Sequence, residues 1–144
     1  MPGIVVVGVD ESGTAAKAAA KAAELAEALG AELIAVNAFD RSDVPPAVEG
    51  RDLPPFTAHD GAESIAQQVL DALRAGHPSL TMTARGQLGR PADAIVAAAE
   101  EVGASVIVVG NKRVQGISRV LGSIATHVAQ HAPCDVYIAH TVER

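Results

Sequence analysis

Apolar residues along this chain gather in short runs, separated by longer stretches of helix-forming residues. Short runs rich in Val, Ile, Leu and Ala are typical of strands that are covered on both faces. They predict strands at residues 4–9, 32–38, 80–84 and 105–109, and a last strand from Asp135 to His140. The stretches between them are rich in Ala, Leu, Lys and Glu, or place apolar residues three and four positions apart, as helix faces do. They predict helices at residues 14–29, 60–74, Pro91–Val102 and Ser123–His131.

Strands and helices alternate along the chain, which is the pattern of parallel strands joined by right-handed helical crossovers. We therefore expect one α/β domain over residues 1–144. Its architecture would be Rossmann-like: a doubly wound, five-stranded parallel sheet of order 3-2-1-4-5 with helices on both faces. Gly30 and Gly103 are expected to end helices, and Pro91 to open one. The prolines between Phe39 and His59 predict a long loop.

Composition narrows the class of protein. The chain is 49% hydrophobic but only 2% aromatic, so its core must consist of small aliphatic side chains. A net charge of −6 argues against nucleic-acid binding, which needs a basic face. No apolar run approaches the roughly 18 residues of a membrane helix, and the first residues do not resemble a signal peptide. Cys134 is the single cysteine, which fits a reducing compartment. We expect a soluble, cytoplasmic protein that contacts neither membrane nor nucleic acid.

Polar residues follow the two most apolar strands. Asp10 comes directly after the first of these strands, and Gly110 follows the fourth. In a doubly wound sheet, ligands bind beyond the carboxyl ends of the strands, at the point where the chain order reverses. If the two strands are neighbours, both segments border one crevice. We therefore expect Asp10 to face a ligand.

The loop from Gly110 to Ser123 has the features of a phosphate site. Gly122 and Ser123 open a helix, whose first N–H groups and dipole attract anions, and glycine lets a phosphate approach the backbone. Between its ends the loop holds three cations and no acid: Lys112, Arg113 and Arg119. This reversal of charge in an acidic protein favours a polyanionic ligand. The alternative is that Ser123 only caps its helix and that the cations are solvated.

Several segments, in this order, resemble the universal stress protein family. Gly-Val-Asp-Glu-Ser from Gly8 is similar to the family's G-x-D-G-S, which ends its first strand. Gly-Arg-Pro-Ala-Asp-Ala-Ile from Gly89 resembles its G-x-P-A-x-x-I. Val-Val-Gly ending at Gly110, Leu-Gly-Ser-Ile around Ser123 and His-Ala-Pro-Cys-Asp-Val from His131 resemble its carboxyl-terminal signature. The resemblance covers essentially the whole chain and implies the same α/β fold.

The ATP-binding branch of that family carries the motif G-x2-G-x9-G-[ST]. By resemblance, Gly110 is its first glycine, and Gly122 with Ser123 is its last pair. The family also has an Asp near the nucleotide, which corresponds to Asp10, and a backbone that lines the adenine at or near Val36. The resemblance implies a site for ATP, alone or with Mg2+. The residues expected there are Val9, Asp10, Val36, Gly110, Asn111, Lys112, Arg113, Gly116, Arg119, Gly122, Ser123 and Ile124.

The middle of the loop departs from that motif. Arg113 replaces the second glycine, and eight residues rather than nine separate it from Gly122. Arg113 either forbids a backbone conformation that glycine allows at positive φ, or replaces an N–H contact by a bidentate guanidinium–phosphate contact. Cyclic AMP or AMP is therefore an alternative to ATP. A further alternative is a dimeric interaction protein of this fold that binds no nucleotide.

Catalysis and metal binding find little support in the residues. The chain has neither the Walker sequence G-x4-G-K-[ST] nor an evident carboxylate to orient an attacking water, so we expect no catalytic residues and at most slow ATP hydrolysis. His127 and His131 have a chelating spacing but no third ligand nearby, so we expect no metal site.

The last strand, from Asp135 to His140, is expected at an edge of the sheet. Exposed edges are usually covered or paired, and members of the resembling family commonly dimerise there. We predict a homodimer that uses Val136, Ile138 and their neighbours, and a regulatory protein partner of unknown identity.

Overall fold

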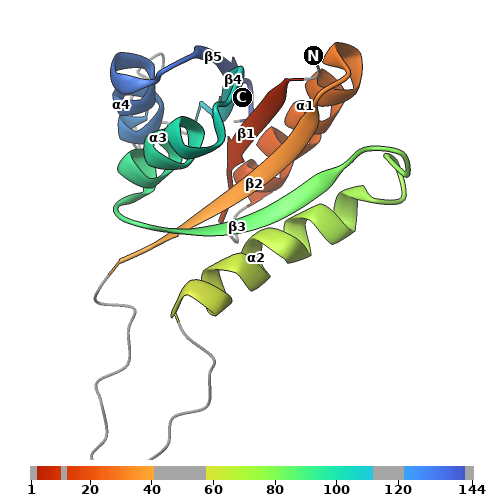
Figure 1. Ribbon diagram of the computed structural model, residues 1–144, viewed down its shortest axis with the longest axis horizontal. Helices are drawn as coiled ribbons and strands as arrows, with labels where there is room; N and C mark the ends of the chain where they lie inside the picture. Colours follow the sequence, from red (N-terminus) through yellow and green to blue (C-terminus); the bar gives the residue numbers. More distant parts are fainter. Residues whose placement is uncertain (1–2, 11–12, 41–57, 112–121, 142–144) are drawn as a thin grey trace, which may run out of the picture.

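A parallel five-stranded sheet forms the centre of the molecule. The computed structural model describes residues 3–10, 13–40, 58–111 and 122–141. The strands are β1 (Ile4–Gly8), β2 (Glu32–Phe39), β3 (Met82–Leu88), β4 (Val106–Gly110) and β5 (Asp135–Ala139). Their order in the sheet is β3-β2-β1-β4-β5 (Figure 1), which confirms the predicted architecture.

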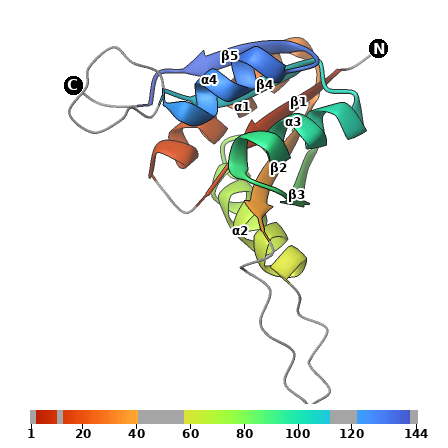
Figure 2. The same cartoon turned by 90° about the vertical axis from the view of Figure 1, so that its left-hand side faces the viewer.

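The helices form one layer on each face of this sheet. They are α1 (Gly13–Leu29), α2 (Ala58–Leu73), α3 (Pro91–Val102) and α4 (Ser123–His131). Figures 1 and 2 show α1 and α2 on one side of the sheet and α3 and α4 on the other. Side chains of successive strand residues point to opposite faces, so Val5 and Val7 belong to the core beneath α1 and α2, and Val6 to the core beneath α3 and α4.

Small side chains build both cores, as the low aromatic content predicts. The side of α1 that faces the sheet consists of buried alanines: Ala15, Ala18, Ala19, Ala22, Ala23 and Ala26. On the opposite face, Gly8 lets α3 lie close to β1, since a Cβ at this position would come within 2.3 Å of the Cδ1 atom of Ile95. Helices can therefore lie close to the sheet on both faces. In the described part of the chain, no helix combines the length and hydropathy that crossing a bilayer requires.

Most element ends agree with the sequence pattern, but β3 does not. Gly30 and Gly103 follow α1 and α3 with φ of +65° and +66°, and Pro91 is the first residue of α3, as predicted. The predicted third strand, at residues 80–84, is wrong in its bounds because β3 continues to Leu88 alongside β2. Residues 41–57 of the predicted loop lie outside the described residues.

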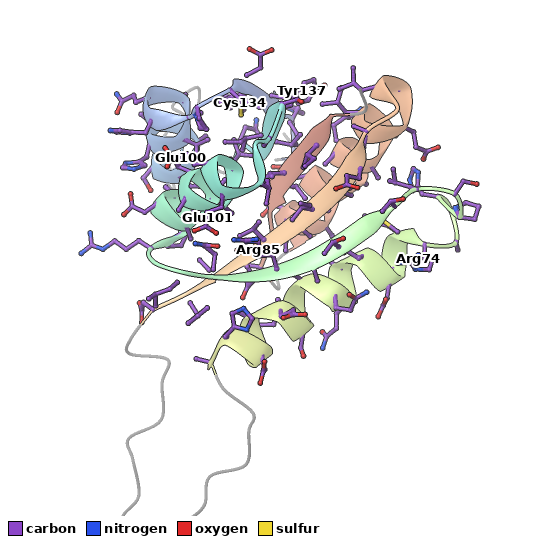
Figure 3. All side chains as sticks on the ribbon, viewed as in Figure 1. Arg74, Arg85, Glu100, Glu101, Cys134 and Tyr137 are labelled. Carbon is purple, nitrogen blue, oxygen red and sulfur yellow. The ribbon has the colours of Figure 1, made fainter. Side chains whose placement is uncertain are left out.

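Polar side chains explain the wrong bounds of β3. The strand lies at the edge of the sheet, and the guanidinium of Arg85 donates to Gln87 on the same strand and pairs with the carboxylate of Glu101 on α3. Arg85 and Glu101 point toward one another in Figure 3. An edge strand tolerates such residues, and they interrupt the apolar run by which a strand is recognised.

Candidate functional site

The carboxyl ends of β1 and β4 lie side by side. Val5, Val6 and Val7 pair with consecutive residues of β4, and the chain leaves the two strands toward opposite edges of the sheet. This is the switch point at which ligands of doubly wound sheets bind. Asp10, which is exposed, follows β1 there, and Asn111 follows β4. The two segments singled out in the sequence are therefore neighbours.

A buried side-chain amide on β2 is hydrogen-bonded to the chain just after β1. The N–H of Val9 donates to the carbonyl of Val36 at 2.8 Å, and Asn37 Nδ2 donates to the carbonyl of Val9 at 2.7 Å. Asn37 is only 8% exposed. Sequence reasoning overlooked this residue, although one signal was present: a single amide near the carboxyl end of a strand that is otherwise apolar after its first residue.

The backbone of β2 beyond Val36 points to the same side of the strand, past the end of β1. The carbonyl of Val36 accepts from Val9, on the β1 side, whereas the carbonyl of Phe39 accepts from the N–H of Gly89 at 2.8 Å, on the β3 side. Backbone groups of successive strand residues point to alternate neighbours, so those of Ala38 share the side of Val36. At Ala38, however, β1 has already ended. Ala38 therefore turns its amide and carbonyl toward the space beyond β1.

The residue after β4 is likewise hydrogen-bonded to β5 and to the residues that follow it. The N–H of Asn111 donates to the carbonyl of Ala139 at 3.0 Å. Asn111 Oδ1 accepts from the N–H of Thr141 at 2.7 Å and from its hydroxyl at 3.1 Å, while Asn111 Nδ2 lies 3.2 Å from His140 Nδ1. The side chain expected to contact a nucleotide thus holds two strand ends together.

Packing explains the glycine at the end of β4. A Cβ on Gly110 would lie 2.9 Å from Thr141 Oγ1 and 3.3 Å from Thr141 Cγ2. Thr141 is 3% exposed, so it has little room to move away. Gly110 is therefore needed for the contact with Thr141, whatever ligand approaches the loop.

The start of α4 is open to solvent. Gly122 occupies the N-cap position with φ −61° and ψ 160°, and among the described residues no side chain caps the helix. Ser123 is its first residue, so the interpretation of Ser123 as the cap is wrong. Ser123 is exposed, and Ile124 is 38% exposed. The first N–H groups of this helix and the Ser123 hydroxyl can therefore meet an anion. The loop residues Lys112, Arg113, Gly116 and Arg119 lie outside the described residues.

Asp10 also borders a groove between α1 and α2. Its volume is about 440 Å³, within the range of small-molecule sites. The side chains around it are mostly aliphatic: Ala16, Ile65, Val69, Ala72 and Leu73, with Gln68. Asp10 therefore lies at the strand ends of the switch point and also borders an apolar groove.

The histidines on α4 have partners other than a metal. His127 Nε2 lies 2.8 Å from the Asp93 carboxylate, and His131 Nδ1 lies 2.9 Å from the His127 carbonyl. Another group, which sequence reasoning overlooked, stands at the start of α2, where His59, Asp60 and Glu63 place one ligand atom each within 4.8 Å of one another. These three side chains are the described ones that could hold a metal, and all are about half exposed.

Comparison with known proteins points to one family. Residues 1–140 of this chain match the universal stress protein family. A universal stress protein of Mycobacterium tuberculosis is 33% identical over 144 residues, which cover 95% of each chain. A universal stress protein of Methanothermobacter thermautotrophicus is 36% identical over 66 residues, which cover 46% of this chain and 45% of the relative.

Solved structures of this family share the fold. A universal stress protein in complex with cAMP has a TM-score of 0.75 and 30% identity, with 98% of each chain covered. The protein UspA of Lactobacillus plantarum has a TM-score of 0.67 and 25% identity, with 96% of this chain and 97% of that chain covered. The Archaeoglobus fulgidus protein in complex with dAMP has a TM-score of 0.58 and 26% identity, with 96% of each chain covered.

Proposed function

Because this chain belongs to the universal stress protein family, we propose that it is a nucleotide-binding regulatory protein of the stress response. The start of α4 carries the proposal: an exposed helix end with glycine at the N-cap, where no side chain of the described residues forms a cap. It follows the loop that leaves β4 at the switch point, where Asp10 leaves β1. Two similar proteins of known structure are complexes with adenine nucleotides, cAMP and dAMP.

In the proposed complex, the phosphates lie on the first N–H groups of α4. The helix dipole and the Ser123 hydroxyl favour their charge. Lys112, Arg113 and Arg119 supply cations from the loop before it. Asp10 accepts from the ribose hydroxyls, and the base lies beyond β1, where the backbone of Ala38 offers one donor and one acceptor.

ATP, alone or with Mg2+, is the ligand that we propose first. Gly110, Gly122 and Ser123 keep the ends of the family's ATP motif, and three cations match a triphosphate better than a monophosphate. Cyclic AMP is the second candidate, because a complex with cAMP is among the similar structures and because Arg113 alters the middle of the motif. AMP is a third, since a dAMP complex is also similar.

We propose that binding, rather than turnover, is the activity. The chain lacks a Walker sequence, so ATP hydrolysis would be slow or absent. Binding would alter the surface that a regulatory partner contacts. We also propose a homodimer through β5, an edge strand on which Tyr137 and Ile138 are 41% and 37% exposed. A lone cysteine supports a cytoplasmic location.

The test is to identify what the protein carries and binds. Mass spectrometry of the supernatant after denaturation should detect an adenine nucleotide. Calorimetry with ATP, ADP, AMP and cyclic AMP should then rank the ligands. A protein that carries no nucleotide, and that none of the four stabilises against heat, would instead be an interaction protein of this fold. Phosphate release from ATP that disappears in Asp10→Ala would make it a slow hydrolase.

A further inference from the structure

Buried polar side chains lie at the strand ends on both sides of the candidate site. Among the described residues, the polar side chains that are buried are those of Asn37 and Thr141. Both lie at the carboxyl edge of the sheet, one on each side of the β1–β4 switch point. Burying a polar group costs free energy unless it is hydrogen-bonded, so its bonds indicate which backbone it holds in place.

On the β1 side, Asn37 fixes the peptide that precedes Asp10. In a regular parallel ladder, the carbonyl of Val9 would accept from the N–H of Ala38. The Asn37 amide, at 2.7 Å, binds this carbonyl instead. The carbonyl belongs to the peptide group that joins Val9 to Asp10. A bond that orients it also orients the Asp10 backbone and keeps β1 at a set distance from Ala38.

On the β4 side, Thr141 fixes the residue from which the phosphate loop departs. Its N–H and its hydroxyl both donate to Asn111 Oδ1, at 2.7 Å and 3.1 Å. Its hydroxyl also packs over Gly110, where a Cβ would come within 2.9 Å of Oγ1. Two bonds and a close contact thus define the direction in which the chain leaves β4.

We propose that Asn37 and Thr141 are positioning residues that set the two halves of the nucleotide site separately. Asn37 sets the nucleoside half, through Asp10 and the space beside Ala38. Thr141 sets the phosphate half, through Gly110 and Asn111. This assignment rests on the proposed function, because it needs a nucleotide in the crevice. Neither side chain contacts the ligand itself.

The test measures two affinity ratios in the full chain. Base discrimination, the Kd for GTP divided by that for ATP, reports on the nucleoside half. The phosphate increment, the Kd for AMP divided by that for ATP, reports on the phosphate half. Asn37→Ala should reduce base discrimination about tenfold and leave the phosphate increment unchanged, and Thr141→Val should do the reverse, since one hydrogen bond is worth up to about tenfold. Thr141→Ser keeps both donors and should retain the increment.

Other outcomes separate this inference from the function on which it rests. Thr83→Val, on the exposed side of β3, is the matched control and should change neither ratio. If both positioning variants weaken every nucleotide equally, their role is only structural and the inference is overturned, while nucleotide binding stands. A wild-type protein with both ratios near one would also overturn it. A wild-type protein that binds no nucleotide overturns the proposed function as well.

Discussion

The side-chain amide of Asn37 spans from β2 to the carbonyl oxygen of Val9, 2.7 Å away, at the point where β1 ends. Asn37→Ala should lower the free energy of unfolding by about 1–3 kcal/mol, because a buried acceptor loses its donor. Urea denaturation measures this loss. Gln67→Ala removes an amide bonded to Asp71 on the exposed side of α2 and should cost less than about 0.5 kcal/mol. Equal losses in the two variants would contradict the importance of burial.

Gly86 should tolerate no side chain. A Cβ there would come within 2.7 Å of the His59 carbonyl oxygen and 3.2 Å of the Glu63 nitrogen, both backbone atoms of α2. Gly86→Ala must therefore displace the helix and should cost about 1–3 kcal/mol. Gly13→Ala, at a helical position where no described atom beyond its chain neighbours and its own helix backbone lies within 4 Å of the added Cβ, should be neutral or stabilise by up to about 1 kcal/mol. Thermal unfolding of the two variants checks this contrast, and a stable Gly86→Ala protein would refute it.

Ser123 should contribute to nucleotide affinity without supporting the fold. It is exposed and does not cap α4, so Ser123→Ala should leave the unfolding temperature unchanged and weaken nucleotide binding several-fold, as expected for one lost hydrogen bond. Gly122→Val should weaken binding further, since its side chain obstructs the N-terminal N–H groups. Calorimetry measures both effects. Ser105→Ala, just before the amino end of β4, is the control and should behave like the wild type. Unchanged affinity in both site variants would exclude this binding mode.

Cys134 should react slowly with thiol reagents. The residue stands at the start of β5 (Figure 3), where burial, and then the Asp135 carboxylate, raise the pKa of its thiol above the ordinary value. A raised pKa lowers the thiolate fraction at a given pH, so alkylation by iodoacetamide at pH 8 should be slower than in the urea-unfolded chain. The pH profile should be displaced to higher pH, and Asp135→Asn should move it partly back. Identical profiles in folded and unfolded protein would contradict this.

The proposed dimer should depend on the exposed apolar residues of β5. Ile138→Lys places a charge on this edge, where pairing of two strands would bury it, and should convert the dimer to a monomer. Light scattering at micromolar concentration measures the mass. Leu88→Lys on β3, the other edge strand, is the matched control, because Leu88 is also exposed, at 52%. A wild-type monomer, or a dimer that survives Ile138→Lys, would exclude this interface.

The alternation of apolar runs and helices was sufficient to predict a parallel sheet covered by helices on both faces, because β1, β2 and β4 are buried and largely aliphatic. The same pattern did not predict the bounds of β3, an edge strand whose polar side chains form hydrogen bonds and an ion pair. The strand-end contacts could not be predicted from the sequence either. Asn37 and Val9 are 28 residues apart, and Asn111 and Thr141 are 30 apart, so only the folded sheet brings each pair together.

Chain order alone was enough to predict three residues of the candidate site. Asp10 and Gly110 were chosen because they follow strands, and Ser123 because it begins a helix. For Gly110 and Asn111, the sequence suggested only a ligand role. The structure shows a packing role for both, because Thr141 lies over Gly110 and is hydrogen-bonded to Asn111. A packing role of this kind cannot be recognised in a pattern of residue types.

The scarcity of aromatic residues has a practical consequence at β5. The chain has one tyrosine, Tyr137, and no tryptophan, and this tyrosine stands 41% exposed on the edge strand. Its ultraviolet fluorescence therefore comes from a single residue at a known position on β5. Quenching and anisotropy of this native signal would report when the β5 edge becomes covered, with no label attached to the protein.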